Sequence, residues 1–528
     1  MPRKTGRVVL PGSERRALPG AVAAGRTDPE ARLTVTLKVR RKQALTSEAA
    51  AAAAPMSRAA LAAAYGADPA DIAKTVAAFD ALGLTADATD QATRTVVLSG
   101  PVSAMEAAFD VKLFDYDHDG GGYRGRVGAI RIARALKGVV VGVFGLDNRS
   151  VAHRRPIAHD AAAAAGAAAT RTPAEFAARY NFPAGDGAGQ SVGILEFGGG
   201  YFPADLAQFC TAAGIAAPPT VTPISVDGTA TNATDGYQSE VMLDIEVVAG
   251  VCPRAAIVVY FAQWTEAGWL AALDKALQDG ANDLGVLVIS WGAAEDTDVW
   301  TPQAMTQVNE ALNEAIALAV TVCVATGDNG SSDGVADGPA HVDFPASSPL
   351  ALAIGGTSVP PAGPDIAWKT GSGLEATYGD GASGGGVSAC WPREAWQGAV
   401  NVTSVNPGAI VGRCTPDLAA NADWSQSPYL TVVGGQTQPN GGTSAAAPLV
   451  AGLVTLINAA RAGRPRVGYI TPKLYQASGV ATIGAAGCTP VVSGDNITAA
   501  AGGYRAGPGY NAVCGWGTPD GTALAGFL

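Results

Sequence analysis

Histidine is scarce in this chain of 528 residues, and its scarcity limits the chemistry that the sequence can support. There are four histidines, and only His341 lies beyond residue 171. An imidazole is the usual base that activates a serine. A serine nucleophile in the body of the chain would therefore need a different base, and a carboxylate is the best candidate.

Three other features that the sequence lacks argue against further classes of protein. No run of about 18 apolar residues is present, so the sequence predicts no membrane-spanning helix. No CxxC pair is present, which argues against a zinc site. The first twenty residues carry charges but no apolar stretch, unlike a standard secretory signal. Export would then use another route, or a signal has been removed.

The chain has seven cysteines. Cys323 lies in the apolar run TVCVATG and is expected to be a buried free thiol. The other cysteines could form three bridges between sequence neighbours, although spacing does not determine the pairing. Such bridges would indicate an oxidising compartment. These six are Cys210, Cys252, Cys390, Cys414, Cys488 and Cys514.

Charge is distributed unevenly along the chain. Residues 1–171 contain 24 Lys and Arg against 16 Asp and Glu, a net charge of +8, whereas residues 172–528 contain 11 against 30, a net charge of −19. Opposite charges attract at neutral pH, so the basic piece could bind the acidic body and be released when acid neutralises it. The alternative is two unrelated choices for solubility. So acidic a body argues against nucleic acid as a partner.

Composition and length indicate more than one globular domain, since the chain is 48% hydrophobic and only 15% charged. Residues 1–150 contain strand-like and helix-like runs of a small α+β domain. Residues 151–171 are rich in alanine and glycine without apolar periodicity. They read as an exposed linker where proteolysis would concentrate, although a short alanine helix is the alternative. The strands are expected at 33–40, 94–100 and 111–117, and the helices at 69–84 and 101–110.

Residues 172–528 alternate apolar strand-like runs with helical runs. The strand-like runs include SVGILEF, AAIVVYFA, LGVLVISWG and VTVCVATGD. This alternation predicts an α/β domain with a parallel sheet covered by helices on both faces. Functional sites in such domains form at the carboxyl ends of the strands.

The candidate nucleophile is Ser444, in the run GGTSAAAPLVAG. It follows two glycines and a threonine and precedes an apolar helix-like segment. Glycines at this point would let a substrate backbone approach a serine at the helix N-terminus. The serine hydroxyl needs a base to become an effective nucleophile.

Two carboxylates in SEVMLDIE could supply that base. Glu240 and Asp244 are four residues apart, so on a helix they share one face. Carboxylates held close together can share a proton, which would let Glu240 accept the proton of Ser444 while Asp244 orients it. Glu246 points elsewhere on the helix. The alternative is an ordinary solvated helix face.

Four further residues could line a cleft. Asp328 follows the strand-like run VTVCVAT, where a protonated carboxyl could donate a hydrogen bond to an oxyanion; the alternative is an aspartate that caps a turn. Glu196 precedes three glycines, Trp291 ends a strand-like run, and Asp343 lies in the extended segment HVDFPASSP. Each of these three could be merely structural.

Together, these segments resemble the sedolisin, or serine-carboxyl peptidase, family, and most closely its kumamolisin branch. The resemblance covers nearly the whole chain. GGTSAAAP is similar to the family motif G-T-S-x-x-x-P, SEVMLDIE to its E-x-x-x-D helix, and VATGDNGS to its oxyanion motif, while ILEFGGGY and ISWG match flanking motifs. The resemblance implies a subtilisin-like parallel sheet flanked by helices.

The resemblance also implies roles for individual residues. Ser444 would be the nucleophile, Glu240 the general base with Asp244 as its partner, and Asp328 the acid that stabilises the tetrahedral intermediate. Glu196 and Trp291 would extend the hydrogen-bonded network. Asp343 would lie in a specificity pocket and favour Arg or Lys before the scissile bond.

The N-terminal piece is similar to the family's pro-segment, in LPGSER, AAYGADPADI, TVVLSG, MEAAFDVKL, YRGR and VFGLDNR. The resemblance implies an acid-active endopeptidase that processes itself. Residues 1–150 would form an inhibitory, folding-assisting pro-domain, residues 151–171 an activation linker and residues 172–528 the peptidase domain. It also implies a secreted protein that acts on proteins and peptides, and we expect a monomer.

The chain departs from the family at a calcium site near the C-terminus. The family has an aspartate in D-I-T and another after G-P-G-x, whereas this chain has Asn496 and Asn511. Calcium affinity falls as carboxylates are lost, so calcium is expected to be absent or weakly bound, and no cofactor is expected to be required. Asp495 could substitute through a shift in register.

Two alternatives give different predictions. A subtilisin-like peptidase with a histidine base would need a histidine motif of the H-G-T-H type, which the sequence lacks, and would work near neutral pH. A binding or scaffolding protein would have lost part of the catalytic set, whereas Ser444, Glu240, Asp244 and Asp328 are all present.

Overall fold

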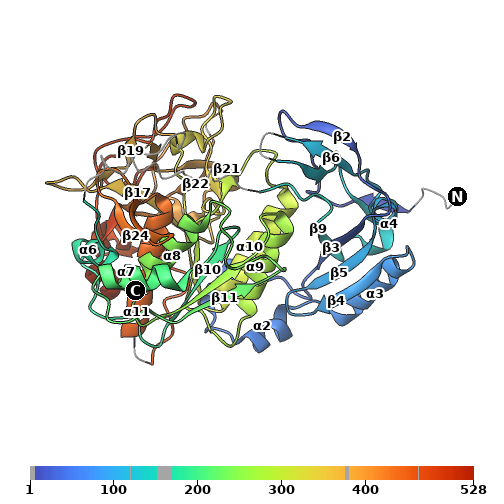
Figure 1. The fold of residues 1–528 in the computed structure, drawn as a ribbon, viewed down its shortest axis with the longest axis horizontal. Coiled ribbons are helices and arrows are strands. Elements are labelled where there is room, and N and C mark those ends of the chain that lie inside the picture. The colour runs from blue at the N-terminus through green and yellow to red at the C-terminus, as the bar shows by residue number, and fades with distance from the viewer. Residues whose placement is uncertain (1–5, 119–120, 152–168, 375–379, 409, 462) are drawn as a thin grey trace. The chain divides into compact units, whose positions relative to one another are not determined.

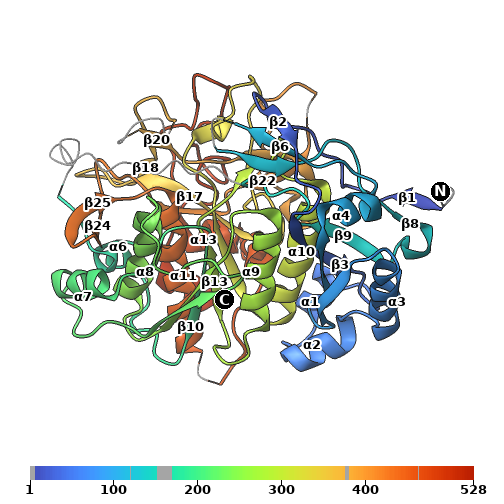
Figure 2. The ribbon, with the colours of Figure 1, turned by 45° about the vertical axis from the view of Figure 1, so that its right-hand side comes forward.

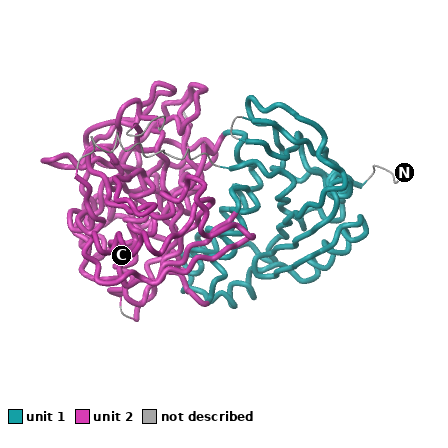
Figure 3. The backbone as a smooth tube through the Cα atoms, viewed as in Figure 1, with its two compact units in different colours: residues 1–151, 263–280, 297–318 teal, residues 152–262, 281–296, 319–528 magenta. Residues whose placement is uncertain are grey.

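The computed structural model describes residues 6–118, 121–151, 169–374, 380–408, 410–461 and 463–528. The chain divides into two compact units (Figure 3). Unit 1 comprises residues 1–151, 263–280 and 297–318, and unit 2 comprises residues 152–262, 281–296 and 319–528. The N-terminal piece therefore forms one unit with two segments from the middle of the chain.

Unit 1 is built on an antiparallel sheet in the order β4-β5-β3-β9. The side chains of β3 (Arg32–Val39) alternate between exposed and buried at first, as expected for a strand with one solvated face. The other strands of this sheet are β4 (Thr85–Asp90), β5 (Thr95–Pro101) and β9 (Val140–Phe144). A second sheet joins β2 (Val22–Arg26), β6 (Phe114–Asp117) and β7 (Tyr123–Gly125), and β1 (Arg7–Val9) pairs with β8 (Arg131–Ala133).

Several helices of unit 1 begin at recognisable capping residues. Asp68 accepts a hydrogen bond from Ala70 N and caps α3 (Pro69–Asp80), and Thr265 and Thr301 cap α9 and α10 in the same way. The four-stranded sheet and α4 bury a common apolar core. The remaining helices are α1 (Ser47–Ala52), α2 (Arg58–Tyr65), α4 (Val102–Phe109), α9 (Glu266–Gln278) and α10 (Pro302–Ala317). The predicted α+β architecture is confirmed.

Unit 2 contains an eight-stranded sheet in the order β11-β12-β10-β13-β15-β17-β18, with β23 also paired to β17. All of these pairs are parallel except β17–β18. The inner strands are almost completely buried, which explains their continuous apolar sequences. The strands are β10 (Ser191–Glu196), β11 (Val221–Ser225), β12 (Ala256–Phe261), β13 (Val286–Ile289), β15 (Thr321–Ala325), β17 (Leu352–Ser358), β18 (Ile366–Ala367) and β23 (Leu418–Asn421).

Two buried helices of unit 2 carry the predicted site. Helix α8 (Gln238–Val251) packs against α11 (Thr443–Ala460), and the two lie side by side in Figures 1 and 2. Among the described residues, α11 alone is long and apolar enough to cross a membrane, but 89% of it is buried within the protein, as in a core helix. The predicted subtilisin-like α/β architecture is confirmed. The other helices are α6 (Pro173–Arg179), α7 (Pro203–Ala212), α12 (Thr471–Leu474), α13 (Ile483–Gly487) and α14 (Gly521–Phe527).

Three segments differ from expectation or cannot be compared with it. The strand expected at 111–117 begins at Phe114, because Asp110 ends α4 in a left-handed conformation with a φ of 53° and the chain must first turn. The helix expected at 69–84 ends at Asp80. Most of the predicted linker, residues 152–168, lies outside the described residues.

The expectation of three disulfides is wrong: all seven cysteines are free thiols. Cys390 and Cys414 lie on the paired strands β21 (Gly386–Pro392) and β22 (Gly412–Thr415), yet their sulfurs have different neighbours. Cys390 Sγ lies 3.7 Å from Glu295 O, and Cys414 Sγ lies 3.1 Å from Arg393 Nη2. The thiol groups of these two cysteines, which are neighbours among the cysteines in the sequence, thus contact different residues. Cys323 is buried and free, as expected.

Candidate active site

Ser444 lies in the first turn of α11 and is 1% exposed. The preceding Gly442 has a φ of 84°, which favours glycine, and a Cβ atom at Gly441 would lie 2.6 Å from Ala422 O. The glycines are therefore required by the turn that leads into the helix. The backbone N–H groups at this helix end make it a favourable environment for an anion.

A hydrogen-bonded chain joins Ser444 to Asp244 through Ser290. Ser444 Oγ donates to the backbone oxygen of Ser290 at 3.4 Å. Ser290 Oγ donates to both carboxylate oxygens of Asp244, at 3.0 and 2.8 Å. Ser290 directly follows β13, at the carboxyl end of a parallel strand. It was not singled out from the sequence, because one serine in an apolar run carries no signal of its direction.

Glu240 lies in the first turn of α8, one helical turn before Asp244. Glu240 is 5% exposed and Asp244 is fully buried, so the expectation of an ordinary solvated helix face does not describe them. Glu246 is directed away, as predicted, and its Oε2 accepts a hydrogen bond from Val432 N at 2.9 Å. Burial raises the pKa of Glu246 well above its ordinary value, and Asp205 adds to the rise.

Glu196 and Trp291 contact each other directly. Trp291 Nε1 donates to Glu196 Oε2 at 2.9 Å, and the carboxylate is fully buried. The two residues stand at the ends of the adjacent strands β10 and β13. The indole ring contacts both Phe197 and Tyr237, with centroid distances of 6.1 and 5.6 Å. Since Tyr237 precedes α8, this contact links the sheet to the helix of the paired acids.

Asp328 is linked to the residue that precedes Ser444. Its Oδ1 accepts hydrogen bonds from Thr443 N and Thr443 Oγ1, each at 2.7 Å. Asp328 follows β15 and is 4% exposed. This carboxyl group is therefore held at the N-terminal end of α11.

Asp343 stands apart from this chain of contacts. It begins the short strand β16 (Asp343–Phe344), which pairs with β14 (Ala293–Ala294), and it is 6% exposed. A Cβ atom at Gly292 would lie 1.9 Å from Asp343 Oδ1, so the carboxyl group packs on that glycine. Burial raises the pKa of Asp343 well above its ordinary value, and Asp333 and Asp328 raise it further.

His341 cannot serve as a free base. Its Nδ1 lies 2.6 Å from Asp296 Oδ1 and its Nε2 lies 2.8 Å from Asp337 Oδ1. Although burial opposes protonation, the hydrogen bonds to these two carboxylates raise the pKa of His341 to about 9. The imidazole is therefore a cation held between two acids at acidic and neutral pH.

The residues of the family calcium site do not fit a calcium ion. Asn511 Nδ2 donates to Val491 O and Gly507 O, each at 3.2 Å, and Asn496 Nδ2 donates to Gly385 O at 3.2 Å. At these positions the side-chain amide groups thus direct N–H groups toward carbonyl oxygens, whereas a calcium ion would need oxygen atoms as ligands. The described residues contain no cluster of three or more acidic, histidine or cysteine side chains that could hold a metal.

Asp495 does not replace the missing carboxylates. Its Oδ1 lies 2.8 Å from Lys369 Nζ and its Oδ2 lies 3.3 Å from Arg505 Nη1. Burial by itself would raise the pKa of Asp495, but Lys369 and the backbone N–H of Ile497 lower it. The charge of this carboxylate is already balanced by two cations.

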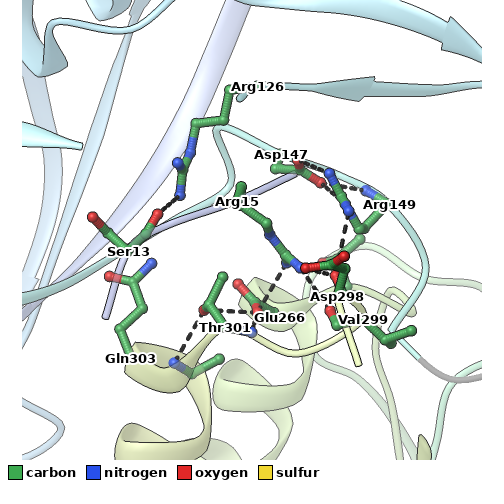
Figure 4. Close-up of polar contacts among 12 residues, drawn as sticks. Ser13, Arg15, Arg126, Asp147, Arg149, Glu266, Asp298, Val299, Thr301 and Gln303 are labelled. Atoms are coloured by element: carbon green, nitrogen blue, oxygen red, sulfur yellow. Dashed lines mark hydrogen bonds and ion pairs between the residues drawn. The ribbon is translucent and has the colours of Figure 1, made fainter. Parts of the chain in front are cut away.

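Unit 1 joins basic N-terminal residues to its two later helices (Figure 4). Arg15 is 5% exposed, and its Nη2 lies 2.9 Å from Glu266 Oε1 at the start of α9. Its Nη1 donates to the backbone oxygens of Asp298 and Val299 at 3.0 and 2.6 Å. Other pairs are Lys38 with Asp274 and Arg41 with Glu310 and Glu314. The opposite net charges of the two parts of the chain thus correspond to direct ion pairs.

Comparison with known proteins agrees with this architecture. A model of the subtilase family, Peptidase S8, matches residues 215–517, and a model of the pro-kumamolisin activation domain matches residues 19–149. Kumamolisin of Bacillus sp. (strain MN-32) is 42% identical over 544 aligned positions, which cover 98% of this chain and 95% of that protein. Sedolisin of Pseudomonas sp. (strain 101) is 28% identical and covers 81% of this chain and 74% of its own length.

A solved structure of Pseudomonas sedolisin, a serine-carboxyl proteinase complexed with two molecules of pseudo-iodotyrostatin, matches with a TM-score of 0.59 and 27% identity. The match covers 69% of this chain and 98% of that chain. The chain therefore belongs to the subtilase family. Within that family it is a serine-carboxyl peptidase of the sedolisin group with a kumamolisin-type activation domain.

Proposed function

We propose that the chain hydrolyses internal peptide bonds in acid through an acyl-enzyme on Ser444. Glu240 acts as the general base, Asp244 as its partner and Asp328 as the oxyanion donor. The observation that supports this proposal best is the hydrogen-bonded chain from Ser444 through Ser290 to Asp244. It places a buried acid of α8 in the same network as the hydroxyl group that must lose a proton.

In the acylation step, Ser444 Oγ attacks the carbonyl carbon of the scissile bond, and its proton passes to Glu240. The carbonyl oxygen becomes an oxyanion that accepts a hydrogen bond from the protonated carboxyl group of Asp328. One such donor lowers the barrier by about 3 kcal/mol. Collapse of the intermediate breaks the C–N bond, and the leaving amine takes the proton from Glu240.

In the deacylation step, a water molecule gives a proton to Glu240 and attacks the acyl carbon. The ester bond to Ser444 Oγ breaks, and the serine recovers its proton from Glu240. The proposed steps need a proton on Asp328 and an ionised carboxylate on Glu240. Glu196 and Trp291 support the base from the sheet side, and Asp343 contacts a basic substrate side chain before the scissile bond.

The N-terminal piece acts as an intramolecular inhibitor until it is cut away. Residues 1–150 form this pro-domain, residues 151–171 contain the cut and residues 172–528 are the mature peptidase. The activation-domain match at residues 19–149 and the ion pairs of Arg15, Lys38 and Arg41 support this assignment. We further propose that the protein is secreted, acts as a monomer on protein and peptide substrates and binds no nucleic acid.

The test is to incubate the purified precursor between pH 3 and 7 and map new N-termini by mass spectrometry. The wild type should be cut within residues 151–171 in acid. The Ser444→Ala and Glu240→Gln variants should process at least about a thousandfold more slowly, because nucleophile and base act as a unit. Glu246→Gln is the matched control on the same helix and should process normally. Processing of Ser444→Ala at the wild-type rate would disprove the nucleophile assignment.

We also propose that calcium is absent or only weakly bound near the C-terminus. The amide groups of Asn496 and Asn511 donate hydrogen bonds to carbonyl oxygens that a cation would otherwise draw together. These bonds, together with the ion pairs of Asp495, stabilise the C-terminal loops without a metal. The proposed chemistry requires no cofactor.

A further inference from the structure

A second acid, the half-buried Asp333, lies beside Asp343. Asp333 ends the short 3-10 helix Gly330–Ser332 in a left-handed conformation, with a φ of 48°. A Cβ atom at Gly327 would lie 2.9 Å from Asp333 Oδ1 and 3.6 Å from Asp343 Oδ2. Both carboxyl groups therefore border one glycine, and that glycine directly precedes Asp328.

The protein gives these two carboxyl groups few hydrogen-bond donors. Asp333 Oδ2 and Asp343 Oδ1 are both buried, and neither accepts a hydrogen bond from a residue that the structure describes. Asp343 is 94% buried, since it is 6% exposed. Burial without hydrogen-bond donors disfavours the charged form of a carboxyl group. Two such groups close together can share one proton.

The surrounding charges act mostly in the same direction. Burial raises the pKa of Asp333 to about 7, and Asp296, Asp328 and Glu295 add to the rise while His341 opposes it. The positive charge of His341 is already balanced by Asp296 and by Asp337. The pair consequently gains its first negative charge as the pH rises from acid and gains a second only at higher pH.

We propose that Asp333 tunes specificity: by sharing a proton with Asp343, it sets the pH at which the Asp343 pocket becomes negative and accepts a basic substrate side chain. This inference rests on the proposed peptidase function. Asp333 is a positioning residue, because it acts through Asp343 and need not touch the substrate. Preference for basic residues should then increase with pH within the range in which the enzyme works.

The direction in which removal of Asp333 changes the preference for basic substrates separates two possible roles of this residue. If Asp333 were a second direct ligand for the basic side chain, its removal would weaken the preference at every pH. If it acts by repulsion on Asp343, its removal lets Asp343 ionise at lower pH, so a variant with one acid fewer prefers basic substrates more strongly in acid.

The experiment compares two peptides that differ only in an arginine or a citrulline before the scissile bond. Citrulline has nearly the same shape without the charge. The ratio of kcat/KM for the two peptides is measured from pH 3 to 7, and the pH dependence common to both reactions cancels in the ratio. For the wild type, the ratio should rise with pH.

In Asp333→Asn, the midpoint of this rise should move down by about one pH unit. At a fixed pH below the midpoint, the arginine preference should increase about tenfold. Asparagine tolerates the left-handed backbone at this position, and Asp333→Gly gives the same prediction if the first variant does not fold. Asp186→Asn, at an aspartate of the same unit whose side chain is 45% exposed, is the matched control and should leave the midpoint unchanged. Asp343→Asn should abolish the rise.

An unchanged midpoint in Asp333→Asn, or a lower ratio at every pH, would overturn the inference. A wild-type ratio near one at every pH would also overturn it while leaving the peptidase function intact. If the wild type cleaves neither peptide and does not process itself, the proposed function itself fails.

Discussion

Ser290, which was not identified from the sequence, connects single residues of the candidate site. The backbone oxygen of Ser290 accepts a hydrogen bond from Ser444 Oγ, and the hydroxyl group of Ser290 donates to the carboxylate of Asp244. A carboxylate whose two oxygens share the proton of one hydroxyl group is held in a defined orientation, and in the proposed mechanism the orientation of the acid pair decides how efficiently it accepts a proton. In the proposed mechanism, Ser290 is therefore a positioning residue rather than a catalytic one.

We expect Ser290→Ala to lower kcat by about tenfold to a hundredfold with little change in KM, because it removes the donor that orients Asp244 without touching the substrate pocket. Ser290→Thr keeps the hydroxyl group and should recover part of the activity. Steady-state kinetics on a citrulline peptide at acid pH measure both parameters.

The matched control is Ser388→Ala. Ser388 Oγ donates to both oxygens of another buried acid, Glu295, at 2.8 and 2.9 Å, but it lies outside the hydrogen-bonded chain of Ser444. An equal fall in kcat in both variants would show that loss of any buried serine acts through stability, and the positioning role would be wrong.

Some site residues could be found from the sequence and others could not. Ser444 follows glycines that its turn requires, and the spacing of Glu240 and Asp244 places them on one helix face; both are local properties. The direction of Ser290 and the separate partners of Cys390 and Cys414 depend on segments distant in the sequence. The expected disulfides failed for this reason, since spacing carries no information on the direction of a thiol.

At the scale of elements, apolar runs with strong periodicity identified the inner strands and the long helices. Helix α8 and strands β12, β13 and β15 lie where the sequence placed them. The edge strand β11 was not anticipated, because it is largely exposed and contains Pro223, which is tolerated only where the ladder lacks a partner on one side.

The C-terminal loops provide a prediction at this scale. Neither EDTA nor added calcium should shift the melting temperature of the wild type by more than about 1 °C. Asn511→Asp should lower it by roughly 2–4 °C, because the carboxylate cannot donate to Val491 O and Gly507 O and places a negative charge beside them. Calcium should then restore stability to Asn511→Asp. Thermal unfolding measures all three effects.

Asn406→Asp is the matched control for the loop experiment. Asn406 Nδ2 donates to Ala340 O at 2.7 Å, so the same substitution breaks a similar bond in another loop. It should lose stability without recovering it in calcium. A wild-type melting temperature that falls by several degrees in EDTA would contradict the proposal of a metal-independent C-terminal region.

In the whole molecule, charge asymmetry along the chain corresponds to ion pairs within unit 1. Arg15 is one of the buried N-terminal cations that reach the later segment, whereas the adjacent Arg16 is exposed. Replacing one partner of a buried ion pair costs about 3–5 kcal/mol. Unit 1 should therefore depend strongly on Arg15 and weakly on Arg16.

We expect the Arg15→Gln precursor to process faster, and at higher pH, than the wild type, because its N-terminal piece is held less tightly to α9 and α10. The adjacent Arg16→Gln is the matched control and should process like the wild type. Mass spectrometry of new N-termini from pH 3 to 7 measures both. Slower processing of Arg15→Gln, with an intact melting transition, would show that Arg15 does not restrain the pro-domain.

Two aspartates of unit 1 respond to acid in opposite directions. Burial by itself would raise the pKa of Asp147, but Arg15 and Arg149 lower it. The ionised Asp147 therefore stabilises the folded state above about pH 4, and this stabilisation is lost as the pH falls below that value. Burial raises the pKa of Asp274 despite Lys38, so this residue alone favours the folded state more in acid. Acid release of the pro-domain is therefore expected through the arginine cluster around Asp147.

The sequence by itself determined the fold class, a small α+β piece followed by a parallel α/β body, because periodicity, capping and local spacing depend on neighbouring residues. Only the tertiary structure decided which side chains meet. It grouped α9 and α10 with the N-terminal piece, engaged both nitrogens of His341, kept the thiols apart and brought Asp333 beside Asp343. Such contacts join residues distant in the chain, and their geometry depends on how the elements pack.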